Sequence, residues 1–84
     1  MIRRNFNIED LELSLTKLYG VDGIKVMNTI LPGIIMDFQK VLVDRDGSDE
    51  VTEEYRLEDG KGVIQVKGRR TPDGDMTIDG IEVL

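Results

Sequence analysis

The chain has 84 residues, enough for one hydrophobic core and too few for two domains. It contains neither histidine nor cysteine, so disulfides and thiolate metal sites are excluded, and the commonest general base and the best nucleophile are missing. The net charge of −6 argues against nucleic-acid partners, because phosphates repel an acidic surface. We therefore expect a single acidic domain, spanning residues 1–84, that is not an enzyme.

The sequence also predicts where the protein resides. Two arginines follow the first residues without an apolar run behind them, which does not fit a secretory signal. No apolar stretch approaches the ~18 residues that a membrane-spanning helix requires. We therefore expect no membrane partner and take a cytoplasmic location as the default.

Two helices are predicted in the first part of the chain, over residues 7–31. Asn7 is suited to cap the first helix, which carries acids in its early turns and leucines at helical spacing and ends at Gly20. Asp22 is suited to cap a shorter second helix, and Pro32-Gly33 is expected to stop it. Several β-branched residues in this second stretch disfavour a helix.

Residues 34–44 fit either a helical stripe or a strand that alternates apolar and polar positions. The mostly β-branched end at Val41-Leu42-Val43 favours the strand. Asp44 and Asp46 also favour it, because acids are unfavourable at the C-terminus of a helix. We therefore predict a strand here, at the edge of a sheet.

Three Asp-Gly dipeptides predict the rest of the fold: Asp46-Gly47, Asp59-Gly60 and Asp73-Gly74. Asp-Gly supplies the two positive-φ residues of a type I′ turn, so each dipeptide marks a two-residue hairpin loop. Pairing outward from these turns places one mainly apolar set on a common face. The set is Ile34, Met36, Phe38, Leu42, Val51, Tyr55, Leu57, Ile64, Val66, Ile81 and Val83. The opposite face carries Ile35, Val41, Val43, Val63, Met76, Ile78 and Leu84.

These elements together predict an α+β fold in two layers. Two N-terminal helices pack on one face of a four-stranded antiparallel meander, which covers residues 34–84. The opposite face of the first strand remains apolar at a sheet edge, which is a liability unless something covers it.

The acidic residues concentrate in residues 44–59, where eight acids and two arginines account for the whole net charge of −6. Six of them are predicted to form one outward acidic strip: Asp46, Asp49, Glu50, Glu54, Glu58 and Asp59. Such a strip is either a solvated surface or a binding surface for a basic partner. The leading hypothesis is a small protein-binding module, an inhibitor or adaptor carried by a phage or mobile element, that engages a basic surface of its partner.

The competing hypothesis is a structural subunit of a homo-oligomer or larger assembly. It would associate through the exposed apolar side chains of the predicted first strand, Ile35, Val41 and Val43. The mass in solution at low and high salt distinguishes the two hypotheses, because apolar association resists salt and acidic binding does not.

Two further motifs are explained better as ordinary structural features than as binding sites for a metal ion or nucleic acid. Residues 44–50 are faintly similar to a calcium loop but lack the glycine and glutamate that the EF-hand spacing requires. The basic cluster of Lys67, Arg69 and Arg70 is too small for nucleic-acid binding and lacks stacking aromatic residues. We therefore expect no cofactor, no metal and no nucleic-acid partner.

Overall fold

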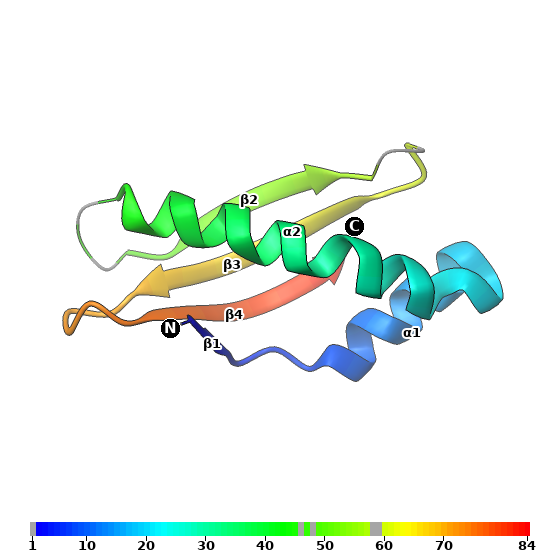
Figure 1. Cartoon of the computed structure of the whole chain (residues 1–84), viewed down its shortest axis with the longest axis horizontal. Coiled ribbons are helices and arrows are strands. Elements are labelled where there is room, and N and C mark those ends of the chain that lie inside the picture. Colours follow the sequence, from blue (N-terminus) through cyan, green and yellow to red (C-terminus); the bar gives the residue numbers. More distant parts are fainter. Residues whose placement is uncertain (1, 46, 48, 58–59) are drawn as a thin grey trace.

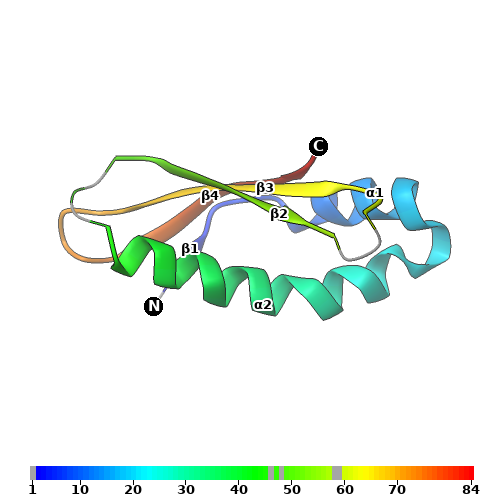
Figure 2. The same ribbon diagram turned by 90° about the horizontal axis from the view of Figure 1, so that it is seen from above.

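The computed structural model describes residues 2–45, 47, 49–57 and 60–84. The elements are, in chain order, strand β1 (Ile2–Arg4), helix α1 (Ile8–Tyr19), the 3-10 turn η1 (Gly20–Asp22), helix α2 (Gly23–Val43) and strands β2 (Val51–Arg56), β3 (Val63–Arg70) and β4 (Met76–Val83). The strands form one sheet in the order β1-β4-β3-β2. Helix α2 crosses one face of this sheet, and α1 packs against α2 and β4 (Figures 1 and 2). The predicted α+β class is confirmed.

The helical part is one joined segment and not two separate helices. Asn7 caps α1 as predicted, since its side-chain oxygen accepts a hydrogen bond from the backbone N–H of Glu9 at 2.9 Å. Helix α1 ends at Gly20 (φ 68°), and η1 leads directly into α2, where the Asp22 side chain makes no capping hydrogen bond. A Cβ on Gly23 would lie 2.6 Å from the Thr16 nitrogen, so glycine permits this tight turn.

The predicted strand over residues 34–44 is wrong, because residues 34–43 belong to α2. The helix continues through Pro32-Gly33, where it was expected to stop, and ends at Val43. Pro32 removes one helical hydrogen bond, but Pro32 and Asn28, whose carbonyl loses its partner, are both exposed, so water can replace the bond. Burial of the apolar stripe beyond Pro32 outweighs this local cost.

The exposed apolar edge proposed for self-association is therefore absent from the described fold. Ile35 is only 6% exposed and Val41 packs partly against the core, while Val43 remains exposed. Met36, which the strand placed in the core, is 62% exposed. The predicted Asp46-Gly47 hairpin is also wrong: Gly47 (φ 90°) lies between α2 and β2, and Asp46 lies outside the described residues.

The sheet is mixed and not purely antiparallel. Strand β2 pairs antiparallel with β3, and β3 with β4, but β1 pairs in parallel with β4 at the edge. The sequence did not predict β1. The predicted β2–β3 register is confirmed, with Arg56 opposite Val63 and Tyr55 opposite Ile64.

The predicted β3–β4 register is also confirmed. The prediction missed two features, a longer turn and a bulge, whose effects on the register cancel. Val66 lies opposite Ile81 as expected. The turn is longer than two residues, since hydrogen bonds join Thr71 N to Asp75 O at 2.7 Å and Gly74 N to Thr71 O at 2.9 Å. A bulge, which leaves Asp79 without a ladder partner, restores the register. In the part of β4 before the bulge, the inward-facing and outward-facing positions are exchanged relative to the prediction. Two residues predicted on the outer face are therefore buried: Met76 and Ile78.

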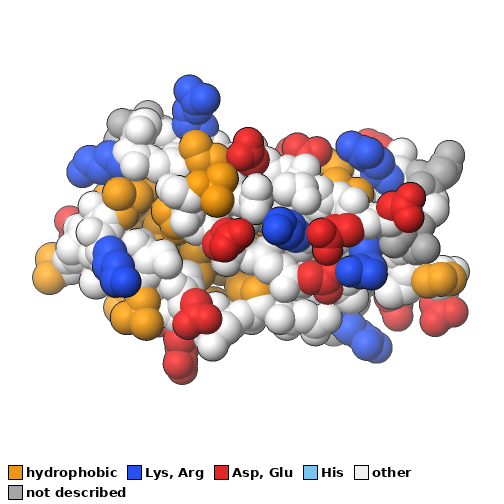
Figure 3. Space-filling view, turned by 180° about the vertical axis from the view of Figure 1, so that it is seen from behind, with side chains coloured by type: hydrophobic (Ala, Val, Ile, Leu, Met, Phe, Trp, Pro, Cys, Tyr) orange, Lys and Arg blue, Asp and Glu red, His pale blue; other side chains and the backbone are white. Residues whose placement is uncertain are grey.

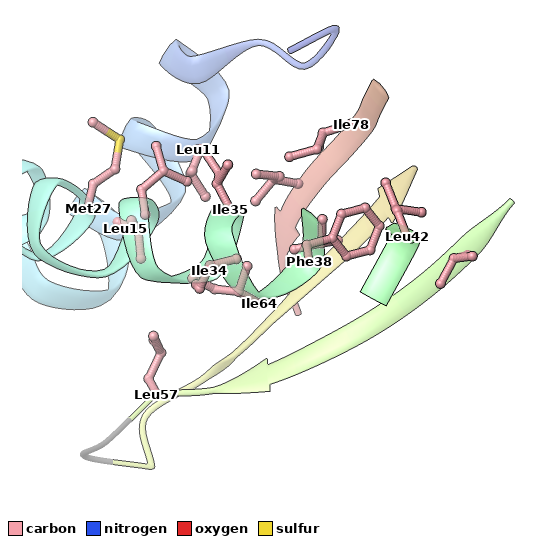
Figure 4. Packing of buried hydrophobic residues seen from close by; sticks show 14 of the residues in the cluster. Leu11, Leu15, Met27, Ile34, Ile35, Phe38, Leu42, Leu57, Ile64 and Ile78 are labelled. Carbon is pink, nitrogen blue, oxygen red and sulfur yellow. The ribbon is translucent and has the colours of Figure 1, made fainter. Parts of the chain in front are cut away.

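The core lies between the helices and the inner face of the sheet (Figure 4). Its most deeply buried side chains come from α1, α2, β3 and β4: Leu11, Leu15, Phe38, Leu42, Ile64, Val66 and Ile78. At Gly68, α2 approaches the sheet closely. A Cβ at this position would lie 2.7 Å from Cε2 of Phe38 and still closer to the backbone oxygen of Thr77. The aromatic ring therefore packs directly on the backbone of β3.

Gly68→Ala is expected to lower the free energy of unfolding by about 1–3 kcal/mol, because the added methyl overpacks this contact. Gly33→Ala is the matched control: its Cβ would meet nothing within 4 Å, and replacing a helical glycine should stabilise the fold by up to ~1 kcal/mol. Urea denaturation of both variants measures the difference. A Gly68 variant as stable as the parent would show that α2 does not approach β3 in this way.

Candidate functional site

An open groove of about 970 Å³ lies between α2 and the end of β2. Its apolar lining comes from Val26, Ile30 and Ile34 on α2 and from Leu57, which follows β2. Figure 4 shows Leu57 on the sheet side, away from Ile34 on the helix. The groove is also lined by both signs of charge: Asp22, Lys25, Asp37 and Arg56.

Tyr55 connects the two walls of this groove. Its hydroxyl donates a hydrogen bond to Oδ2 of Asp37 at 2.8 Å, which joins β2 to α2. Burial raises the pKa of the Tyr55 phenol above its ordinary value, and the hydrogen bond to Asp37 raises it further. The hydroxyl therefore stays protonated at neutral pH and acts as a donor that positions β2 against the helix.

Two further contacts hold the elements around the groove. The Lys61 ammonium lies 5.2 Å from the centre of the Tyr19 ring, and this cation–π contact links the β2–β3 turn to the end of α1. At the other end of α2, Nη1 of Arg70 donates to the carbonyl oxygen of Val43 at 3.0 Å. The arginine thus binds one of the carbonyls that a helix C-terminus leaves without a partner.

The predicted acidic strip is only partly described. Asp46, Glu58 and Asp59 lie outside the described residues, whereas Asp49, Glu50 and Glu54 are all exposed.

Basic side chains offset part of this acidic surface. Glu50 accepts a hydrogen bond from Nη2 of Arg69 at 3.5 Å, and Nε of the same arginine lies 3.1 Å from Oδ2 of Asp79. Figure 3 shows the outer face of the sheet with acidic and basic side chains interspersed. Within the described residues, the outer surface near β2 is therefore a mixed charge network with an acidic excess, and the continuous strip stays a prediction.

The helix wall of the groove could not be predicted while residues 34–44 were assigned to a strand. Its side chains do recur at helical spacing from Asp22 through Val26, Thr29 and Gly33 to Asp37. Extending the helical period through Pro32-Gly33 would have placed them on one face. Nothing in the sequence alone indicates that the end of β2 lies beside this face.

The joined helical segment Ile8–Val43 is long and apolar enough to cross a membrane by length and composition alone, with a mean hydropathy of 1.3 over its best window. This long segment was not predicted, because the helix was expected to end at Pro32-Gly33. In the fold its apolar stripe has a packing role, because Met27, Leu31 and Phe38 are buried in the core. Among the described residues, no group of three or more acidic side chains is placed to hold a metal ion.

Tyr55→Phe is expected to lower the free energy of unfolding by about 1 kcal/mol through loss of the bond to Asp37. It should also change the response to alkali. In the parent, the unfolded chain releases the Tyr55 proton near its ordinary pKa of about 10, and the folded chain releases it only at higher pH. Stability therefore falls as the pH rises above about 10.

The Phe variant should lose that part of the alkaline decrease, which chemical denaturation at about pH 8 and about pH 11 would measure. An unchanged alkaline response would mean that Tyr55 is not held by Asp37 in solution. The alkaline decrease in stability that remains in the Phe variant measures the contribution of the other titrating groups.

Comparison of the chain with models of known families, with curated proteins and with solved structures finds no match. Its function is therefore inferred from the groove and from the charges around it.

Proposed function

We propose that this chain is a small non-enzymatic protein-binding module that receives part of a partner protein in the groove between α2 and β2. The groove itself supports the proposal. Val26 and Ile30 are only half-buried there, beside the buried Ile34 and Leu57. Covering such side chains with a partner removes apolar surface from water, which is the main favourable term in association.

The charges near β2 suit a basic partner. Residues 49–56 contain four acids and one base, Arg56, which gives this stretch a net charge of −3. Complementary charge at the rim of an interface raises the association rate and selects the partner more than it adds affinity. A module of this kind would act as an inhibitor or adaptor by occupying a basic surface on its partner.

Binding is better supported than catalysis at this site. The Tyr55 hydroxyl, with its raised pKa, donates to Asp37 and is a poor base or nucleophile at neutral pH. Lys25 and Arg56 contribute positive charge to the groove. Neither Thr29 nor Tyr55 has a neighbouring histidine to activate its hydroxyl, since the chain contains none.

A second candidate function is a structural subunit that associates through the helical end of the molecule. Val21 is 98% exposed in η1, with Leu13 at 61% and Ile24 at 49% on the flanking helices. These residues replace Ile35, Val41 and Val43 as the apolar surface for self-association. Sedimentation at low and high salt tests this function, because a salt-resistant oligomer would favour it.

Blocking the groove should abolish partner binding without unfolding the protein. Gly33 lies on the helix wall, and a Cβ added there would meet nothing within 4 Å, so Gly33→Gln extends a neutral side chain into the groove. Gly33→Ala leaves the groove open and controls for the change in helix propensity. Affinity capture from source cells should recover one partner with the parent and the Ala variant but not with the Gln variant. Equal recovery by all three would exclude the groove as the contact surface.

Reversing charges near β2 should slow association with that partner. The double change Asp49→Lys and Glu54→Lys is chosen because both side chains are exposed and neither is in the Arg69 ion-pair network. We expect a lower association rate and a weaker salt dependence, with stability nearly unchanged.

The control for this experiment is Asp75→Lys with Glu82→Lys, which makes the same change in net charge away from β2. Surface plasmon resonance at low and physiological salt compares the two double variants. If both slow association equally, net charge alone governs binding, and the acidic surface near β2 has no specific role.

A further inference from the structure

Strand β2 forms one edge of the sheet, and its backbone direction can be deduced from two hydrogen bonds. Leu57 donates its N–H to Gly62 O at 3.0 Å, so the backbone of Leu57 faces β3. Val63, which lies opposite Arg56, instead accepts from Leu84 N at 2.8 Å and so faces β4. Both observations place Leu57 in a hydrogen-bonded pair and Arg56 in a non-hydrogen-bonded pair.

The alternation of an antiparallel ladder extends this result along β2. Glu53 and Tyr55 direct their backbone groups to β3, whereas Thr52, Glu54 and Arg56 direct theirs away from the sheet. Within the part of the chain that the structure describes, no backbone hydrogen bond outside the ladder involves these last three residues. The edge of β2 therefore presents a row of donors and acceptors suited to another strand.

This edge runs directly into the groove. Tyr55, Arg56 and Leu57 line it, so a chain added along β2 would direct alternate side chains between Leu57 and α2. Toward the start of β2 the surroundings change from apolar to acidic. Glu53 is half-buried on the helix side of the strand and Glu54 is exposed on the outer side.

We propose that β2 binds an extended segment of a partner protein as an added strand, with a large apolar side chain of that segment in the groove and lysine or arginine beside Glu53 and Glu54. This inference rests on the proposed function and names the partner's chemistry. Main-chain hydrogen bonds would supply affinity, and the groove and the two glutamates would supply specificity. Opposite charges on neighbouring strands are favourable, which selects a basic segment over an acidic one.

The test uses two synthetic peptides, acetyl-Thr-Leu-Thr-Ile-Lys-Lys-Lys-amide and its reversed sequence, which cover both chain directions along β2. Binding is followed by the amide signals of ¹⁵N-labelled protein and by hydrogen exchange. We expect one peptide to bind, with shifts and new protection at Thr52, Glu54 and Arg56. Replacing its lysines by glutamates should weaken binding at least tenfold.

N-methylation of the bound peptide distinguishes strand addition from simple docking in the groove. Methylating one set of alternate backbone amides should weaken binding at least tenfold, and methylating the other set should have little effect, because only one set faces β2. Glu54→Pro should weaken binding similarly while the protein remains folded, because this N–H faces away from β3. The methylated peptides test strand addition even if the proline variant fails to fold.

Three outcomes would overturn the inference. If both methylated peptides bind as well as the parent peptide, the segment occupies the groove without adding a strand, and only the proposed function survives. If neither peptide binds at millimolar concentration, strand addition is contradicted, whereas the function itself is judged by partner capture with the Gly33 variants. Shifts at Glu54 that depend on protein concentration without peptide would show that a second copy of this chain occupies the edge.

Discussion

The packing of the Phe38 ring on the backbone of β3 at Gly68 is the contact on which the arrangement of helix and sheet depends. A side chain at Gly68 would collide with the Phe38 ring of α2 and with the backbone of Thr77 in β4, so one of these would have to move. Near this contact the two layers are in direct contact, and Arg70 binds the end of the helix. Next to Phe38, Asp37 accepts the hydrogen bond of Tyr55, and from there toward the N-terminal end of α2 the groove lies open. The groove therefore lies along the part of α2 that precedes this close packing.

The sequence predicted most of the sheet, because strand register depends on local turns and on alternation. The β2–β3 pairing followed from one turn and was correct. The β3–β4 pairing was correct only because the longer turn at Gly74 and the bulge at Asp79 offset each other. The bulge reversed the faces of Met76 and Ile78, and alternation alone cannot predict such a reversal. The three-residue strand β1 is too short to give a periodic signal.

Residues 34–43 were mispredicted because the helical and strand periods place the same side chains inside. Ile34, Phe38 and Leu42 are buried in either structure, so Ile35, Met36 and Val41 are the apolar residues that distinguish them. Pro32 and the aspartates after Val43 are local signals against a helix, and burial of the stripe outweighs them. The local concentration of charge also predicted that the acids near β2 are exposed, which holds for Asp49, Glu50 and Glu54. The groove was missed because it exists only where α2 and β2 meet.

The pairing of β1 with β4 has a consequence for how the chain folds. It joins Ile2 to Met76, nearly opposite ends of the described chain, and closes the longest loop in the sheet. Ordering that loop has the largest entropy cost, so β1 is expected to dock last, which pulsed hydrogen exchange at Arg3 and Arg4 would detect. Until then the backbone of β4 is uncovered beside its apolar residues, and chains can aggregate edge to edge. The short first strand thus acts as a late cover for β4, and the β2 edge stays open in the folded chain.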